Sequence, residues 1–215
     1  MITVIEPHFY WPDTTSFDNI LQHIERCGRI CYKSEFKITE DSAKDFVRMI
    51  VRNGHESVLE HVSLTAIVVC SRSCSHQLVR HRIAAFSQQS QRYVSLAKSK
   101  SFEVICPPSI GITPGLYTDR MYLPYQQKRW IEFISNSYQE YVDQVNEGVL
   151  AEDARYVLPN ATKTELAVTF NLRQWRHVFK ERALNTHAQW EIRKIFTSIL
   201  MDLNDKVPTV FEDLL

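Results

Sequence analysis

The sequence predicts an α+β fold, a single mixed domain over residues 1–215 with a central antiparallel-type sheet flanked by helices. Two observations lead to this prediction. Short runs of β-branched residues are interspersed with longer stretches in which apolar residues recur every three or four positions. No internal repeat, low-complexity tract or linker divides the chain. With 215 residues, one domain of this size can bury a substantial core.

The first half of the chain is predicted to contain two strands and three helical stretches. Residues 2–6 are rich in β-branched side chains and favour a short strand. One helix is expected from Ser16, its N-cap, to Tyr32, and a second from Asp41 to Asn53. Residues 62–69 read as a buried strand, and residues 71–84 follow with helical spacing. The inward-facing side chains expected on the first two helices are Ile20, Ile24, Cys27, Cys31, Phe46, Met49 and Ile50.

The second half begins with a loop region. Residues 98–124 hold four of the eight prolines and two of the five glycines, so we expect loops there with one strand at Phe102–Ile105. After the loops, the hydrophobic periodicity predicts, in chain order, a long helix around Trp130–Val145, a strand at 164–171, a helix at 172–183 and a helix at 186–203.

Composition restricts the class of protein. Lysine plus arginine equals aspartate plus glutamate, 25 against 25, so no overall positive field draws the chain to nucleic acid. The N-terminal residues lack the basic and apolar regions of a signal peptide, and no apolar run is long enough to span a bilayer. Five cysteines in such a chain indicate reduced thiols. We therefore expect a cytoplasmic protein without membrane or nucleic-acid partners.

Positive charge is nevertheless concentrated locally. Four arginines lie within 21 residues, and residues 73–94 contain no acidic residue. Guanidinium groups, glutamine amides and serine hydroxyls are the groups that bind a phosphate monoester. On a helix, Gln77 and Arg80 would share a face and reach one ligand. The segment predicts a site for an anionic nucleotide, and its arginines are Arg72, Arg80, Arg82 and Arg92.

The arginine-rich segment also carries a pattern that is known from one enzyme family. Arg80-His81-Arg82, then seven residues, then Ser90 resembles the signature motif of flavin-dependent thymidylate synthases, and Gln77 and Gln91-Arg92-Tyr93 extend the match. Residues 55–61 resemble the family's His-Glu-Ser/Thr block. The resemblance covers about residues 50 to 192, and its downstream parts are Arg155 before Leu158-Pro159, Asn171-Leu172-Arg173, Arg182-Ala183 and residues 187–192.

The resemblance implies a reaction and its participants. Members of the family transfer a methylene group from 5,10-methylenetetrahydrofolate to C5 of dUMP and reduce it with a hydride from reduced FAD. NADPH usually reduces the flavin again, and dTMP and tetrahydrofolate are the products. Members are homotetramers, so the same assembly is expected here, with small molecules as the other partners and no resident metal.

The resemblance also implies roles for particular residues. Arg182 would lie beside the uracil ring as the catalytic residue. Because an arginine stays protonated, it cannot remove the N3 proton, but it can stabilise the negative charge of the N3-ionised uracil. The residues implied for dUMP are Gln77, Arg80, Gln88, Gln89, Ser90, Arg92, Arg155 and Arg182. Those implied for FAD are Ser57, Arg80, His81, Arg82, Ile83, Asn171, Arg173 and His177.

His187 receives no catalytic role, because the interval from Arg182 is one residue longer than is usual in the family. A helix-capping or core-facing position is expected for it instead. Cys106 has no neighbouring base that would make it a nucleophile, so a structural thiol is expected.

Two alternative functions are open at this point. A zinc site is one, because Cys27 and Cys31 are four residues apart, as are Cys70 and Cys74. However, three of these cysteines lie on otherwise apolar stripes, where a reduced cysteine packs as a small hydrophobe. The other alternative is a non-catalytic nucleic-acid binder that stacks Phe86 and Tyr93 on bases. The zero net charge argues against this second alternative.

Overall fold

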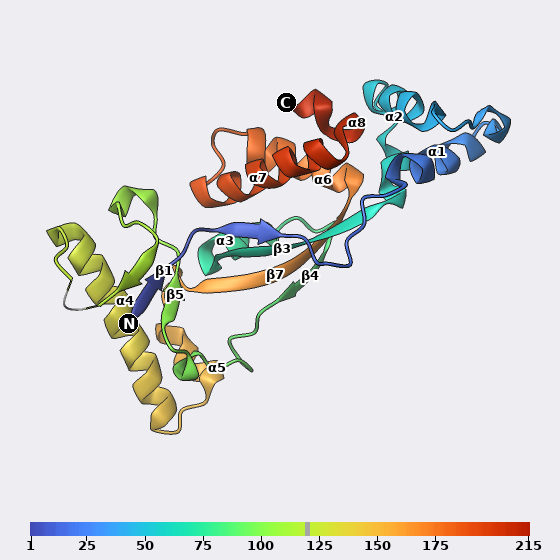
Figure 1. The fold of residues 1–215 in the computed structure, drawn as a ribbon. Helices are drawn as coiled ribbons and strands as arrows, with labels where there is room; N and C mark the ends of the chain where they lie inside the picture. Colours follow the sequence, from blue (N-terminus) through green and yellow to red (C-terminus); the bar gives the residue numbers. More distant parts are fainter. Residues whose placement is uncertain (119–120) are drawn as a thin grey trace. The chain divides into compact units, whose positions relative to one another are not determined.

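The computed structural model describes residues 1–118 and 121–215 as an α+β fold (Figure 1). A three-stranded sheet has the order β5-β1-β6, and a four-stranded sheet has the order β2-β3-β7-β4. The strands are β1 Ile2–Val4, β2 His8–Tyr10, β3 Ser63–Ser71, β4 Ala85–Gln88, β5 Phe102–Val104, β6 Gly115–Tyr117 and β7 Lys163–Asn171. The α+β class is confirmed, with two sheets where one central sheet was expected.

Helices follow the first two strands and separate most of the others. The α-helices are α1 Ile20–Ile30, α2 Ser42–Arg52, α3 Arg72–Leu78, α4 Tyr125–Asn146, α5 Ala151–Ala154, α6 Leu172–Phe179, α7 Trp190–Lys206 and α8 Pro208–Phe211. The short 3₁₀ segments are η1 Glu35–Lys37, η2 Glu56–His61, η3 Leu96–Lys98, η4 Pro108–Ile110, η5 Arg155–Val157 and η7 Glu212–Leu214, and η6 Lys180–Leu184 is a π-helix. Every predicted element has a counterpart, but the helical stretch expected over residues 71–84 ends at Leu78. Among the described residues, the additional elements are at most four residues long, apart from η2, which has six.

The chain divides into two compact units. Unit 1 comprises residues 1–8, 69–77 and 87–166, and unit 2 comprises residues 9–68, 78–86 and 167–215. We describe each unit by itself, and the single domain expected over residues 1–215 stays a prediction.

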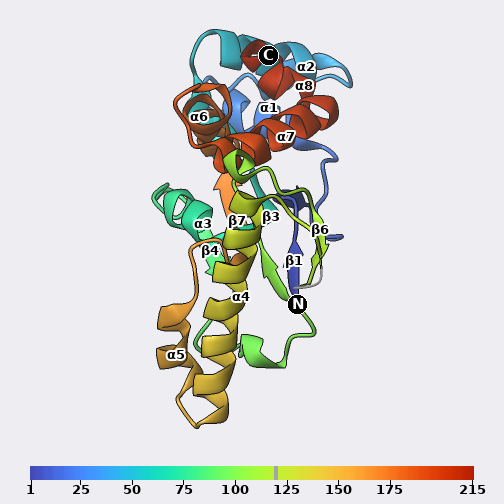
Figure 2. The ribbon, with the colours of Figure 1, turned by 90° about the vertical axis from the view of Figure 1, so that its left-hand side faces the viewer.

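Unit 1 is organised around the three-stranded sheet and α4. β1 pairs parallel with β5, with Ile2 opposite Phe102, and antiparallel with β6. α4 packs on β1 (Figure 2) and contributes Ile131 and Ile134 to the core. Tyr138 of α4 stacks on Phe102 with ring centroids 4.6 Å apart. The period of three and four residues along α4 therefore corresponds to one buried face.

Unit 2 is organised around Trp175 of α6, whose side chain is fully buried. Its ring centroid lies 4.8 Å from that of Phe170, 5.6 Å from that of Phe179 and 6.1 Å from that of Phe196. The indole N–H donates a hydrogen bond to the carbonyl of Leu64 at 3.3 Å. This aromatic cluster joins α6 to α7, β7 and β3, and it fixes the helix on which several candidate site residues lie.

The start of α1 differs from the sequence-based expectation. The helix begins at Ile20 after Asn19, which has a left-handed conformation with φ 56° and makes no side-chain cap. Ser16 instead accepts a hydrogen bond from the backbone N–H of Asp18, in the turn before the helix. The proposed Ser16 cap is wrong, because a local turn uses the hydroxyl before the helix starts.

The buried faces of α1 and α2 also differ in part. Cys27 is only partly buried and Cys31 is exposed, because α1 ends at Ile30. Gly28 is buried instead, where an added Cβ would lie 2.7 Å from the Phe46 ring. On α2 the predicted Met49 is 42% exposed, and its buried residues are Ala43, Val47 and Ile50. Because α1 and α2 pack closely against each other, the buried face of each helix is slightly rotated from the face that the sequence predicted.

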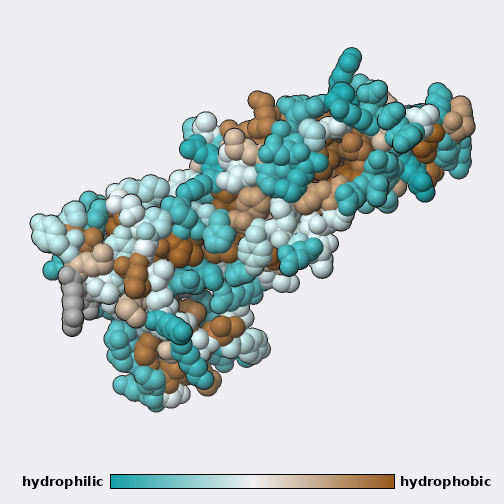
Figure 3. Space-filling model, viewed as in Figure 1, coloured by the Kyte–Doolittle hydropathy of each residue, from teal (hydrophilic) through white to brown (hydrophobic). Residues whose placement is uncertain are grey.

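No helix in residues 1–118 and 121–215 combines the length and apolar character that crossing a bilayer requires. The face of the molecule in Figure 3 shows hydrophilic and hydrophobic residues interspersed.

Candidate functional site

A pocket of about 460 Å³ in unit 2 contains four of the residues predicted to bind FAD. These are Ile83, Asn171, Arg173 and His177. The pocket, called here the α6 pocket, is also lined by Glu56, Glu60, Gln174 and Lys180, to which the sequence analysis gave no role. A signal for Lys180 was present, because Arg173, His177 and Lys180 recur at helical spacing.

The N-terminus of α6 opens onto this pocket. The side chain of Asn171 caps the helix by accepting a hydrogen bond from the backbone N–H of Gln174 at 2.8 Å. Helix N-termini carry partial positive charge, and Arg173 and Lys180 add two full charges to the same pocket. Arg173 pairs with Glu60, but both side chains are about half exposed. Since exposed pairs of this kind contribute little, an anionic ligand can compete for Arg173.

The best-defined contact between predicted site residues joins His81 and Arg182. Arg182 lies in the π-helix η6 and donates its Nε–H to Nε2 of His81 at 2.9 Å, across 101 positions of sequence. Because the arginine can only donate, Nε2 must accept, so His81 is neutral with its proton on Nδ1. The His81 ring also lies 6.4 Å from the ring of His177, centroid to centroid.

The surroundings of His81 maintain this neutral form. Its side chain is buried beside Phe170. The pKa of His81 is lowered from its usual 6.5 to about 4, mainly by burial and also by the charges of Arg182 and His177, while Glu181 acts in the opposite direction. The acceptor that holds Arg182 is therefore available throughout the neutral pH range.

A pH prediction follows from the depressed pKa of His81. The unfolded chain protonates this histidine near pH 6.5, whereas the folded chain resists protonation down to about pH 4. Between these values the unfolded state binds more protons, so the free energy of unfolding should fall as the pH drops from 6.5 towards 4. Urea unfolding at several pH values would measure this effect. His81→Gln should show a weaker dependence across the window, and an identical dependence in both proteins would contradict the prediction.

Unit 1 holds six of the eight residues implied for dUMP: Gln77, Gln88, Gln89, Ser90, Arg92 and Arg155. Gln88 of β4 is already anchored, because its amide donates to Ser75 at 3.0 Å and to Thr164 at 3.1 Å. Gln89 differs, because its Oε1 is buried and has no hydrogen-bond partner in the part of the chain that the structure describes. An unsatisfied buried acceptor is costly, so Gln89 is suited to receive a ligand donor.

Two arginines of unit 1 contact Glu152. Arg92 forms an ion pair with the Glu152 carboxylate, and Arg155 donates its Nε–H to the Glu152 backbone carbonyl at 2.9 Å. Arg72 lies close enough for the charge of Arg155 to act on it: burial lowers the pKa of Arg72, and Arg155 lowers it further. Glu152 thus supplies the counter-charge that residues 73–94 lack, and neighbouring guanidinium groups still favour an anion.

Several predicted relationships are not found. α3 ends at Leu78, so Gln77 and Arg80 do not share a helical face. The helix stops because the chain turns there to reach β4, with His81 donating its backbone N–H to the Leu78 carbonyl. Arg80 and Arg82 are exposed, as is Ser57 in η2. His187 is also exposed rather than core-facing, and Gln189 is the N-cap of α7.

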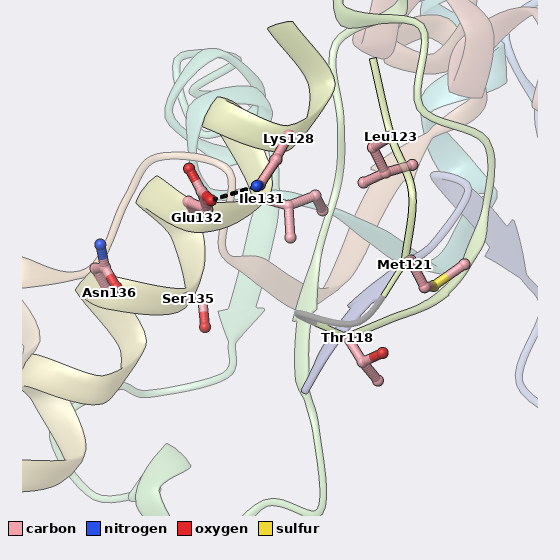
Figure 4. A pocket seen from close by; sticks show the side chains of 8 residues that line it. All are labelled: Thr118, Met121, Leu123, Lys128, Ile131, Glu132, Ser135 and Asn136. Atoms are coloured by element: carbon pink, nitrogen blue, oxygen red, sulfur yellow. Dashed lines mark ion pairs between the residues drawn. The ribbon is translucent and has the colours of Figure 1, made fainter. Parts of the chain in front are cut away.

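A second pocket, of about 340 Å³, lies in unit 1 between α4 and the segment that contains Thr118, Met121 and Leu123 (Figure 4). Its charged residues are Lys128 and Glu132, which pair with each other at 3.7 Å. None of its lining residues was implicated by the sequence. The α6 pocket therefore remains the better candidate for a cofactor.

Comparison with known proteins supports the same interpretation. A family model described as thymidylate synthase complementing protein matches residues 14–209. Relatives named flavin-dependent thymidylate synthase include one from Pyrococcus furiosus, 40% identical over 78% of this chain and 65% of the relative. Another from Geobacter sulfurreducens is 38% identical over 90% of this chain and 84% of the relative. One from Mycobacteroides abscessus is 35% identical over 98% of this chain and 85% of the relative.

The match to the Pyrococcus relative spans 65% of its length, slightly less than two thirds. The family model, by contrast, takes in nearly all of this chain, including both the arginine-rich segment and the α6 pocket. The chain therefore belongs to the thymidylate synthase complementing protein family, the family of the flavin-dependent thymidylate synthases.

Proposed function

We propose that the protein is a flavin-dependent thymidylate synthase that converts dUMP to dTMP. The one-carbon donor would be 5,10-methylenetetrahydrofolate, released as tetrahydrofolate, and NADPH would reduce the FAD. The observation that carries the proposal is the hydrogen bond from Arg182 to His81 in the unit that also contains the α6 pocket. Both residues belong to motifs that the sequence shares with the family.

The α6 pocket fits the chemistry of FAD. When bound, FAD supplies the hydride that the transferred one-carbon group needs to become a methyl group. Arg173 and the capped N-terminus of α6 would hold the pyrophosphate, since both favour an anion. Ile83, which is 69% exposed, offers apolar surface to a flat ring, and Asn171 and His177 would donate or accept hydrogen bonds. Ser57, Arg80, His81 and Arg82 complete the proposed FAD set.

The dUMP phosphate would be held by guanidinium groups, those of Arg80, Arg92 and Arg155. Gln77, Gln88, Gln89 and Ser90 would contribute the neutral hydrogen bonds. Support comes from the unsatisfied Gln89 Oε1 and from the mutual repulsion of Arg72 and Arg155, both of which a bound nucleotide monophosphate would relieve.

Arg182 would act on the uracil ring. Its Nε–H is donated to His81, so Nη1 and Nη2 would face the N3–C4–O4 system of the base. Stabilising negative charge on that system raises the electron density at C5, the carbon that attacks the methylene group. A neutral His81 holds the guanidinium group in place without competing for the substrate's charge.

The proposal also includes a homotetramer and a cytoplasmic location, as expected from the family and from the free cysteines. The assembly can be checked by light scattering of the purified protein.

The visible absorption spectrum tests the proposed function. Protein purified with added FAD should be yellow, and dUMP should shift the flavin bands, because the nucleotide would lie against the isoalloxazine ring. With NADPH and methylenetetrahydrofolate, dTMP should form. A colourless protein that does not retain added FAD would refute the proposal, as would one carrying a stoichiometric metal and no flavin.

A further inference from the structure

Arg176, on α6, is the most extensively hydrogen-bonded charged side chain described in unit 2, and the proposed mechanism does not use it. Its side chain is 2% exposed. Nε donates to Oε1 of Glu56 at 2.9 Å, and the two Nη groups form a bidentate pair with the Asp213 carboxylate, both at 2.7 Å. Nη1 also donates to the backbone carbonyl of Val210. At least four of its five N–H groups are therefore used.

These contacts connect three separate segments of chain. Glu56 is the first residue of η2, Arg176 lies in the middle of α6, and Val210 and Asp213 belong to α8 and η7. Burial by itself lowers the pKa of Arg176, and its hydrogen bonds to Asp213 and Glu56 outweigh burial and raise it. A buried cation needs such partners. Glu56 supplies one of them from a side chain that is 22% exposed and Asp213 the other from a side chain that is 46% exposed.

Glu56 also lines the α6 pocket, with its side chain 22% exposed. An unpaired carboxylate at this position would repel the anionic cofactor proposed above. Pairing with Arg176 reduces that repulsion and holds η2, with Ser57 next to Glu56, in one place. Asp213 does not line the pocket. It fixes the orientation of the Arg176 guanidinium group, which donates a hydrogen bond to Glu56.

We propose that Arg176 and Asp213 are positioning residues of the α6 pocket, which fix the Glu56 carboxylate and the η2 wall of the site. The inference rests on the proposed function for its ligand, FAD. According to this inference, α8 and η7 help to build the cofactor site, although they carry none of the residues predicted to bind a ligand.

Asp213→Asn tests this inference with little change in side-chain size. The variant keeps the fold elements but weakens the bidentate pair, so Arg176 is no longer held for Glu56. We expect the Kd for FAD, measured by quenching of flavin fluorescence, to rise about tenfold, a loss of about 1.4 kcal/mol. Backbone amides of residues 56–61 should also exchange hydrogen faster in the protein without ligand. Asp213→Glu, which restores the charge, should recover part of both effects.

Glu212→Gln is the matched control. Glu212 is the neighbour of Asp213 in η7 and pairs with Arg48 at 2.8 Å, but both side chains are more than 40% exposed and neither lines the α6 pocket. This variant should bind FAD like the wild type.

The outcomes separate the two proposals. A wild type that binds FAD together with an Asp213→Asn variant of unchanged Kd and unchanged exchange at 56–61 would overturn the inference alone. A wild type that does not bind FAD would overturn the proposed function and, with it, the positioning role. Equal losses in Asp213→Asn and Glu212→Gln would also overturn the inference, because they would indicate a general loosening of η7.

Discussion

Arg182→Ala should lower kcat for dTMP formation about 100- to 1,000-fold while leaving FAD bound. The arginine is proposed to stabilise charge that develops on the uracil ring during the reaction, and one preorganised donor of this kind typically contributes about 3–4 kcal/mol to lowering the barrier. The pocket that would hold FAD is lined by other residues, so its occupancy should change little. Steady-state kinetics and the flavin absorption of the same sample measure both quantities.

The control for this variant is Arg193→Ala. Arg193 lies on α7 in the same unit and donates to the backbone carbonyl of Thr186 in an exposed hydrogen bond. Its removal should leave kcat near the wild-type value. If Arg182→Ala also turns over at a near-normal rate, Arg182 has no part in the chemistry. Loss of flavin together with turnover would assign it a structural role instead.

Trp175→Ala should reduce the free energy of unfolding by about 3–5 kcal/mol. The indole is fully buried among Phe170, Phe179 and Phe196, so the substitution leaves a large cavity that the surrounding rings cannot fill. It also removes the donor to the Leu64 carbonyl. Urea unfolding followed by far-ultraviolet circular dichroism would measure the change.

Tyr32→Ala provides the comparison in the same unit. Tyr32 is 86% exposed, and its removal should change the free energy of unfolding by no more than about 0.5 kcal/mol. A loss for Trp175→Ala as small as that for Tyr32→Ala would show that the aromatic cluster does not hold α6 in place.

Long periodic segments could be predicted from the sequence. β7, α4 and α7 were expected within a few residues, because each buries one face over at least nine positions and the periodicity is repeated several times. β3 was expected from its run of β-branched residues. β2, β6 and α8 were not expected. Three or four residues carry no measurable period, and such elements form only when neighbouring segments supply their hydrogen bonds and contacts.

The site shows the same division. The motifs pointed to Arg182, to His81 and to four of the eight residues that line the α6 pocket, which are Ile83, Asn171, Arg173 and His177. The motifs did not show that Nε of Arg182 is bound by His81, since these residues are 101 positions apart. The ion pair of Arg92 with Glu152 could not be predicted from the sequence either, because residues 73–94 contain no acidic residue and Glu152 lies far along the chain.

By itself, the sequence determined the α+β class, the main helices and strands, the family and the types of side chain available for an anionic ligand. Only the tertiary structure decided which charges are paired, that the pKa of His81 is lowered and which helix faces are buried. Local patterns depend on neighbours within one or two turns of chain, whereas pKa values, ion pairs such as Arg176 with Asp213, and the packing around Gly28 depend on segments brought together by folding.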